Sequence, residues 1–187
     1  MKRRWIATLS LGLAGIGLAG YALLAQAALQ PGATAPEFTV QATLGGKAYQ
    51  YVLHDALAHG PVVLYFYPAA FTTGCTIEAH DFAEAMPQYQ ALGATVLGVS
   101  HDDLDTLKRF SVSECRSKFP VGADTDAHII QAYDAAFSFK RDMANRISYV
   151  ITPDGKVLYS YSSLSPDQHV ANTLQALRAW RASHPLH

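Results

Sequence analysis

Short runs of apolar residues recur along the chain and predict β-strands. Residues 62–67 and 95–100 are apolar nearly throughout, which is typical of strands buried on both faces of a sheet. The pair Gly45-Gly46 predicts a hairpin turn, and so does Pro153 followed by Asp154 and Gly155. The predicted strands are residues 36–40, 47–53, 62–67, 95–100, 119–123, 147–151 and 157–161.

Apolar residues spaced three and four positions apart predict helices between these strands. The longest such helix runs from about residue 75 to residue 92, and one apolar face carries Phe82, Ala85, Met86 and Tyr89. Asp102 or Asp103 can cap the next helix, which ends near residue 115 or 117.

Two more helices are expected in the second half of the chain. The first covers residues 124–133. The second begins with Ser165 as its N-cap and Pro166 as its first residue, an order that suits the start of a helix. Its core-facing residues are Val170, Leu174, Leu177 and Trp180.

The order of these elements indicates one α/β domain. Strands and helices alternate in the first half, which predicts parallel strands joined by crossover helices, and the second half adds an antiparallel hairpin. We therefore expect a three-layer sandwich of the thioredoxin type, with a mixed sheet between helices, over residues 28–187.

The first 27 residues have the composition of an export signal. Residues 1–4 are basic, residues 5–24 are apolar or small, and residues 25–27 form an Ala-x-Ala cleavage site. An uncleaved membrane anchor is the alternative, because the apolar run is close to the ~20 residues that a span requires. We expect an exported protein, either periplasmic or anchored at the outer face of the inner membrane.

Charge and cysteine content narrow the possible functions. The 187-residue chain has a net charge of −1 and no basic patch or stripe, so nucleic acid is not expected as a partner. Two cysteines, Cys75 and Cys115, remain in a chain that we expect to be exported. Such a pair is either a structural disulfide or a redox-active pair.

Cys75 lies where a predicted strand turns into a predicted helix. The first turn of a helix has free N–H groups and partial positive charge, which can lower a cysteine pKa from ~8.5 to ~3.5–7.5. One turn earlier, the Thr72 hydroxyl can both donate and accept, so it can hold a substrate oxygen and also contact the sulfur. Pro68 can shield the thiolate from water. Glu78, one turn later, is either a solvated or dipole-pairing side chain or a functional one. The alternative for Cys75 itself is a small buried side chain that only packs.

The motif Pro-x-x-x-Thr-x-x-Cys, filled here by Pro68, Thr72 and Cys75, resembles the active-site motif of the peroxiredoxins. The longer form from Phe66 to Glu78 is similar to the peroxiredoxin Q, or bacterioferritin comigratory protein, branch, and the similarity extends over residues 31–180. The resemblance implies a peroxidase that reduces hydrogen peroxide and organic hydroperoxides. It also implies an active-site arginine at Arg146, where a guanidinium would orient the peroxide and favour the thiolate.

The resemblance implies that Cys75 becomes a sulfenic acid, which a second thiol must resolve. Many members of the branch carry that thiol five residues later, where this chain has His80. Some members place it in the next helix, so Cys115 is the candidate for an intrachain disulfide. The alternatives are a one-cysteine peroxidase resolved by an external thiol, and an exported binding module with a structural disulfide.

Other chemistries fit the sequence less well. His80 and His101 lack the Cys-x-x-x-Cys spacing of thioredoxin-fold copper carriers, and a Cys-x-x-Cys oxidoreductase motif is missing. We expect no metal and no cofactor. The resemblance implies a thioredoxin-like reductant, although export favours another thiol donor, and it implies a monomer.

Overall fold

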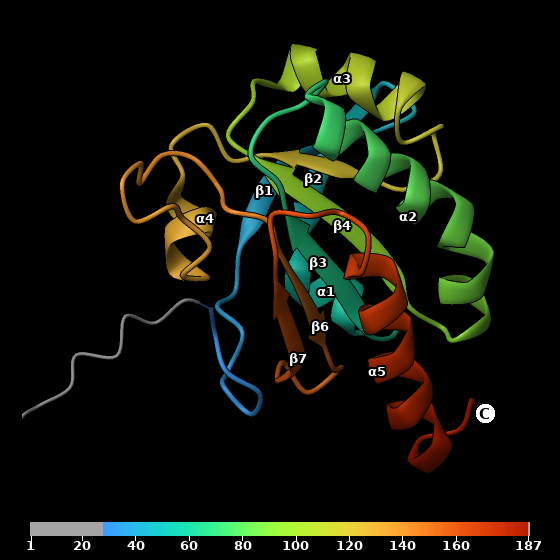
Figure 1. Cartoon of the computed structure of the whole chain (residues 1–187). Helices are drawn as coiled ribbons and strands as arrows, with labels where there is room; N and C mark the ends of the chain where they lie inside the picture. Colours follow the sequence, from blue (N-terminus) through green and yellow to red (C-terminus); the bar gives the residue numbers. More distant parts are fainter. Residues whose placement is uncertain (1–27, 187) are drawn as a thin grey trace, which may run out of the picture.

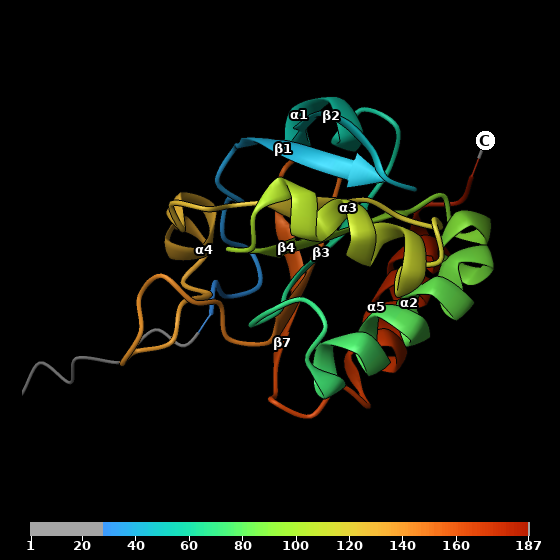
Figure 2. The same ribbon diagram turned by 90° about the horizontal axis from the view of Figure 1, so that it is seen from above.

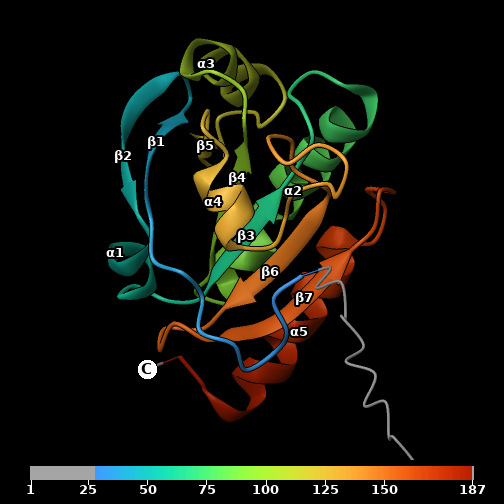
Figure 3. The same ribbon diagram turned by 90° about the vertical axis from the view of Figure 1, so that its left-hand side faces the viewer.

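Seven strands form one mixed sheet, in the order β2-β1-β5-β4-β3-β6-β7 (Figure 3). The computed structural model describes residues 28–186, so the signal or anchor predicted at residues 1–27 lies outside the described residues. Strands β3, β4 and β5 are parallel, and the other neighbouring pairs are antiparallel. The strands are β1 (Thr39–Leu44), β2 (Lys47–Val52), β3 (Val62–Phe66), β4 (Thr95–Ser100), β5 (Val121–Ala123), β6 (Ile147–Ile151) and β7 (Val157–Ser162).

Helices cover both faces of the sheet. Helices α2 and α5 lie side by side on one face, and α4 lies on the other (Figures 1 and 2). Within residues 28–186, every helix is too short or too polar to cross a membrane. The helices are α1 (Leu53–Leu57), α2 (Thr73–Ala91), α3 (Leu104–Ser113), α4 (His128–Ala132) and α5 (His169–Ser183). The predicted three-layer, thioredoxin-like α/β sandwich with a mixed sheet is confirmed.

Strand β3 supplies both apolar cores from alternate residues. Val63 and Tyr65 pack with α2, α3 and α5, whereas Leu64 and Phe66 pack with α1 and α4. All five residues of β3 are buried, because the strand lies between β4 and β6 and has helices over both faces. The continuous apolar run at residues 62–67 follows from this central position. The strand ends at Phe66, two residues before Pro68, so a fully buried strand carries the loop that leads to Cys75.

Two predicted helix starts are wrong, and each is replaced by a turn. The helix expected at residues 124–133 covers only His128–Ala132, because Ala127 adopts a left-handed backbone with φ of 56°. The Asp124 carboxylate accepts hydrogen bonds from the N–H groups of Ile129 and Ile130 at 3.2 and 2.8 Å. Asp124 thus satisfies two of the free N–H groups in the first turn of α4, although it lies four residues before the helix.

The last helix begins at His169, not at Pro166, and Gln168 is its N-cap. Residues 163–168 form a loop before it, and backbone carbonyl groups of this loop accept hydrogen bonds from two buried side chains, as described below. Trp180 is half-buried and lies outside the core. Strand β1 also begins later than expected, at Thr39.

Candidate active site

Cys75 is the third residue of α2 and is 1% exposed. The apolar face predicted for this helix is confirmed, since Phe82, Ala85, Met86 and Tyr89 are all buried. The first turn contains no acidic residue, so no carboxylate there offsets the partial positive charge of the helix end. The local chain therefore places the sulfur where a thiolate is favoured.

The loop before Cys75 is tied to the end of β4. The Ala70 N–H donates to Asp102 Oδ2 at 2.8 Å, and the Ser100 hydroxyl donates to the same oxygen at 2.7 Å. Phe71 has a φ of 64°, a conformation that is costly for a bulky residue, and its ring meets Phe110 edge-on at 5.3 Å. Asp102, just after β4, and Phe110, in α3, thus fix the shape of the loop.

Thr72 occupies the N-cap position of α2 without capping it through its side chain. Its hydroxyl donates to the Ala69 carbonyl oxygen at 3.0 Å and is exposed. Because the donor is engaged, the oxygen lone pairs remain to accept a hydrogen bond from a substrate. Pro68 is half-buried at the start of the same loop. The expected contact of Thr72 with the sulfur is not among the hydrogen bonds of residues 28–186.

Arg146 immediately precedes β6 and reaches the first turn of α2. Its Nη2 group donates to Cys75 Sγ at 3.5 Å, and its Nη1 group donates to Glu78 Oε2. Its Nε group donates to the Leu164 carbonyl oxygen at 3.0 Å. The side chain is 5% exposed, so the guanidinium is held in a fixed direction by three partners. The structure therefore brings together Cys75 and the arginine that the motif resemblance implied.

Gly74 makes room for this arrangement. A Cβ atom at this position would lie 3.0 Å from Arg146 Nη2, which is closer than ordinary van der Waals contact. The glycine between Thr73 and Cys75 thus lets the guanidinium approach the helix start.

Glu78 is fully buried and pairs with Arg146, so the interpretation of this residue as a solvated helix side chain is wrong. Burial raises the pKa of Glu78, and the Arg146 guanidinium opposes part of that rise. Burial by itself would lower the pKa of Arg146, but Glu78 and Cys75 together raise it. Glu78 lies three residues after Cys75, which places the two side chains on the same side of the helix. This spacing was the feature of the sequence that indicated a role for Glu78 in the site.

Two further residues of the site carried no signal in the sequence. His169, at the start of α5, lies 3.7 Å from Glu78 Oε1 through its Nδ1 atom. The same Nδ1 atom is hydrogen-bonded to Ser148 Oγ at 2.8 Å. Both side chains are fully buried. Their approach to Glu78 depends on how β6 and α5 pack against α2.

Cys115 lies in the turn after α3 and is fully buried. Burial, and then the neighbouring Glu114 carboxylate, raise the pKa of the Cys115 thiol. Cys75 and Cys115 belong to the same apolar core cluster, and both are free thiols in this structure. His80 contacts Glu114 through Nε2 and Oε2 at 2.9 Å. Within residues 28–186, no group of three or more metal-ligating side chains is placed to hold a metal ion.

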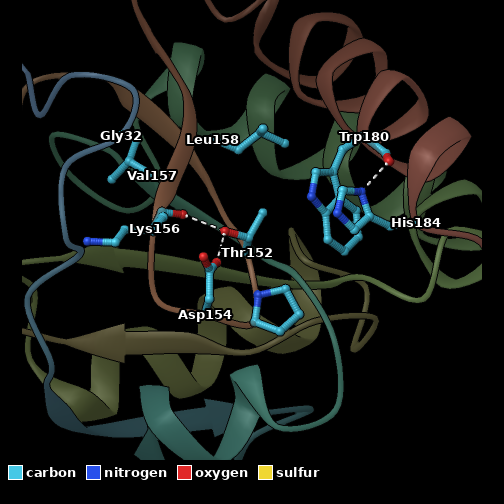
Figure 4. A pocket seen from close by; sticks show the side chains of 9 residues that line it. Gly32, Thr152, Asp154, Lys156, Val157, Leu158, Trp180 and His184 are labelled. Atoms are coloured by element: carbon cyan, nitrogen blue, oxygen red, sulfur yellow. Dashed lines mark hydrogen bonds between the residues drawn. The ribbon is translucent and has the colours of Figure 1, made fainter.

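A pocket of about 670 Å³ lies at the other end of β6 from Arg146 (Figure 4). It is formed by the β6–β7 turn, the adjacent N-terminal segment and the end of α5. Thr152 donates to Asp154 within the turn at 2.5 Å, and the rings of Trp180 and His184 stack at 4.4 Å. None of the predicted catalytic residues lines this pocket, so the candidate active site remains at Cys75.

The fold and the site together define a thioredoxin-like protein with a buried cysteine and arginine at a helix N-terminus. Comparison with known proteins places it in a family. The sequence model of the AhpC/TSA family matches residues 31–160, so the chain belongs to the AhpC/TSA family. The chloroplastic peroxiredoxin Q of Oryza sativa subsp. japonica is 30% identical over 149 residues, which cover 79% of this chain and 66% of the rice protein. This chain thus spans slightly less than two thirds of that relative.

Solved structures agree with this assignment. The structure of peroxidoxin BcpB from Mycobacterium tuberculosis has a TM-score of 0.74 and 30% identity, over 81% of this chain and 97% of that chain. The structure of the Xanthomonas campestris bacterioferritin comigratory protein has a TM-score of 0.68 and 27% identity, over 76% and 91% of the two chains. The resemblance to the peroxiredoxin Q and bacterioferritin comigratory protein branch is confirmed.

Proposed function

We propose that this protein is a thiol-dependent peroxidase in which Cys75 reduces hydrogen peroxide and organic hydroperoxides. The contact of Arg146 Nη2 with Cys75 Sγ, in the first turn of α2, is the observation that carries the proposal. A fixed positive charge beside a sulfur at a helix N-terminus favours the nucleophilic thiolate. The solved Xanthomonas campestris relative was described for alkyl peroxide reduction, which supports the inclusion of organic hydroperoxides.

The reaction follows from the groups around the sulfur. The Cys75 thiolate attacks the terminal oxygen of the peroxide, the O–O bond breaks, and Cys75 becomes a sulfenic acid. The departing oxygen leaves with the bonding electron pair and takes up a proton, which yields water or an alcohol. Arg146 stabilises the negative charge on that oxygen, the Thr72 oxygen accepts a hydrogen bond from the peroxide, and Pro68 limits water access.

Cys115 is the proposed resolving thiol. Its sulfur would attack the sulfenic acid, form a disulfide with Cys75 and release water. Both cysteines are buried on separate helix ends, so the start of α2 and the turn after α3 must loosen first. An external thiol, thioredoxin-like or supplied at the membrane, would then reduce the disulfide. Direct resolution of Cys75 by an external thiol is the alternative.

Stoichiometric peroxide tests the function. We expect the reduced wild-type protein to lose free thiol and the Cys75→Ser variant to consume no peroxide, whereas Cys115→Ser still oxidises at Cys75. A linked Cys75–Cys115 peptide in the oxidised wild type, seen by mass spectrometry, would support resolution by Cys115. A protein whose Cys75 stays reduced under peroxide would instead be a binding module, and overoxidised Cys75 beside free Cys115 would favour the one-cysteine cycle.

We also propose that the protein is exported, with residues 1–27 as a cleaved signal and residues 28–187 as the folded, monomeric enzyme. The basic, apolar and Ala-x-Ala parts of the first 27 residues support export. Cell fractionation combined with N-terminal sequencing distinguishes a cleaved periplasmic form from an anchored one. Light scattering of the purified protein measures whether it is a monomer.

A further inference from the structure

Glu78 has one oxygen that the hydrogen bond from Arg146 does not use. Oε2 accepts from Arg146, but Oε1 is fully buried and has no hydrogen-bond partner among residues 28–186. His169 Nδ1 lies 3.7 Å from this oxygen. A buried carboxylate oxygen without a donor is costly, because the oxygen has lost its water and gained nothing in return. Whether this oxygen carries a proton therefore depends on whether His169 Nδ1 is a donor or an acceptor.

The hydrogen bonds of His169 fix its tautomer. Its Nε2 atom lies 3.0 Å from the Ser163 carbonyl oxygen, which can only accept, so Nε2 carries the proton. Burial, together with the nearby Arg146 charge, lowers the pKa of His169 to about 4, so the ring is neutral at neutral pH. Nδ1 is then an unprotonated acceptor, and the Ser148 hydroxyl donates to it at 2.8 Å.

Two acceptors consequently face each other if Glu78 is ionised. The His169 Nδ1 lone pair and a negatively charged Glu78 Oε1 would repel each other across 3.7 Å. The Ser148 hydroxyl donates to Nδ1 and not to Oε1, so it does not relieve this repulsion. A proton on Oε1 removes the repulsion, and Oε2 then accepts from Arg146 as a carbonyl oxygen. The other titratable or charged groups near this cluster, on the elements packed against it, are Cys75, Asp81, Tyr65 and Tyr89. Of these, Asp81 also favours the protonated form of Glu78.

We propose that His169 is a positioning residue that keeps Glu78 protonated while Cys75 is a thiolate, so that the single positive charge of Arg146 serves the sulfur. One proton is thus exchanged between two groups: Cys75 gives it up, Glu78 holds it, and the net charge of the cluster is unchanged. If both groups were ionised, two negative charges would compete for one guanidinium. The inference rests on the proposed function, since it describes how the reactive thiolate is maintained.

Glu78→Gln is the first test, because glutamine keeps the acceptor for Arg146 and removes the charge. The readout is the pH midpoint for alkylation of Cys75 by iodoacetamide, followed by mass spectrometry. We expect the midpoint to match that of the wild type. If Glu78 is ionised in the wild type, loss of its negative charge beside the sulfur would lower the midpoint by about one pH unit or more, which would overturn the inference. Glu84→Gln, at an exposed position of the same helix, is the matched control.

His169→Asn is the second test. This variant removes the Nδ1 lone pair that faces Glu78, so Glu78 should ionise. The Arg146 charge is then shared between Glu78 and Cys75, and we expect the pH midpoint for Cys75 alkylation to rise by about one pH unit. The double variant Glu78→Gln, His169→Asn should return to the wild-type midpoint. A rise that persists in the double variant would show that His169 acts only through packing, and would overturn the positioning role.

Infrared spectroscopy keeps the inference testable if His169→Asn does not fold. The wild type at neutral pH should show a protonated-carboxyl C=O stretching band that Glu78→Gln lacks, and absence of that band from the wild type would overturn the inference. None of these measurements requires peroxide turnover. A protein with the expected midpoints but no peroxidase activity would therefore refute the proposed function alone, and an active peroxidase with an ionised Glu78 would refute this inference alone.

Discussion

Arg146 Nη2 donates to Cys75 Sγ at 3.5 Å, although 71 residues separate the two along the chain. Arg146 lies directly before β6, and Cys75 lies in the first turn of the helix that follows β3. Strands β3 and β6 are antiparallel neighbours with Phe66 paired to Ile147, so the end of one strand lies beside the start of the other. Sheet register thus brings the guanidinium to the sulfur.

Replacement of Arg146 by methionine should nearly abolish peroxide reactivity. The variant loses the donor for the departing oxygen and the charge that favours the thiolate. Loss of one preorganised donor costs about 10²–10³ in rate in comparable sites, and we expect a loss of at least that size in the second-order rate of Cys75 oxidation. Stopped-flow kinetics with hydrogen peroxide measure it.

Arg116→Met is the control for this variant, because Arg116 is exposed and pairs with Glu84 on the surface. Exposed ion pairs contribute little, so both stability and rate should stay close to the wild type. Equal rate losses in the two arginine variants would contradict the assigned role of Arg146.

Gly74→Ala should separate reactivity from stability. The added Cβ atom would lie 3.0 Å from Arg146 Nη2 and push the guanidinium away from the sulfur. Alanine also favours a helix over glycine by roughly 1 kcal/mol, so the free energy of unfolding should not fall. We expect slower Cys75 oxidation, by about tenfold if roughly 1.4 kcal/mol of the Arg146 contribution is lost, in a protein of unchanged or higher stability. Denaturant titration and peroxide kinetics on the same sample test this, and an unchanged rate would contradict it.

Asp102→Ala should impair the active-site loop. The variant leaves the Ala70 N–H and the Ser100 hydroxyl without their shared acceptor, and an unpaired buried group costs about 1–3 kcal/mol. We expect lower stability and a slower Cys75 oxidation together. Asp103→Ala is the comparison, because Asp103 caps α3 by accepting from the Thr106 N–H at 2.8 Å, and its removal should weaken that helix without touching the loop. Peroxide rates that fall equally in both variants would argue against a specific role for Asp102.

The buried His169 should make folding sensitive to acid. Its pKa is about 4 in the folded protein against an ordinary 6.5, so the unfolded chain binds the proton more readily and stability falls as the pH drops through this window. The comparison is between the single variant Glu78→Gln and the double variant Glu78→Gln, His169→Asn. Both lack the Glu78 carboxyl, so its titration does not contribute to the difference. Their difference in unfolding free energy should shrink by about 3 kcal/mol between about pH 7 and pH 4. Urea titrations measure it, and a pH-independent difference would contradict the neutral state of His169.

The contact between His80 and Glu114 should slow disulfide formation, if Cys115 resolves Cys75. It joins α2 to the residue directly before Cys115, at 2.9 Å, and must break when the two cysteines approach. A partly buried contact of this kind is worth about 0.5–1.5 kcal/mol, so His80→Ala should speed formation of the Cys75–Cys115 disulfide by roughly three- to tenfold. Quenched-flow mass spectrometry follows this step separately from the oxidation of Cys75, which should be unchanged. A disulfide that forms more slowly in the variant would contradict this role.

Local patterns were sufficient for the elements and for the position of Cys75. The apolar run at residues 62–67 and the helical spacing that begins near residue 75 placed the cysteine at a strand-to-helix junction, and the structure confirms it. Helix starts were less predictable, because Asp124 and the pair Ser165-Pro166 have residue types that suit the start of a helix and yet lie in turns. Asp103, by contrast, caps α3 as one of the two residues expected to do so.

Glu78 and His169 show where spacing along the chain ceases to be informative. A glutamate one turn after Cys75 has the same local pattern whether it faces solvent or the core, and packing of β6 and α5 against α2 decided that it is buried. The histidine at the start of α5 has no local pattern at all, because its partners come from three other elements. Periodicity reports which face of an element is apolar, so the chain alone placed Cys75 and its loop at a strand-to-helix junction. Contacts between distant elements depend on strand register and helix packing, so only the folded structure established which charges surround the sulfur.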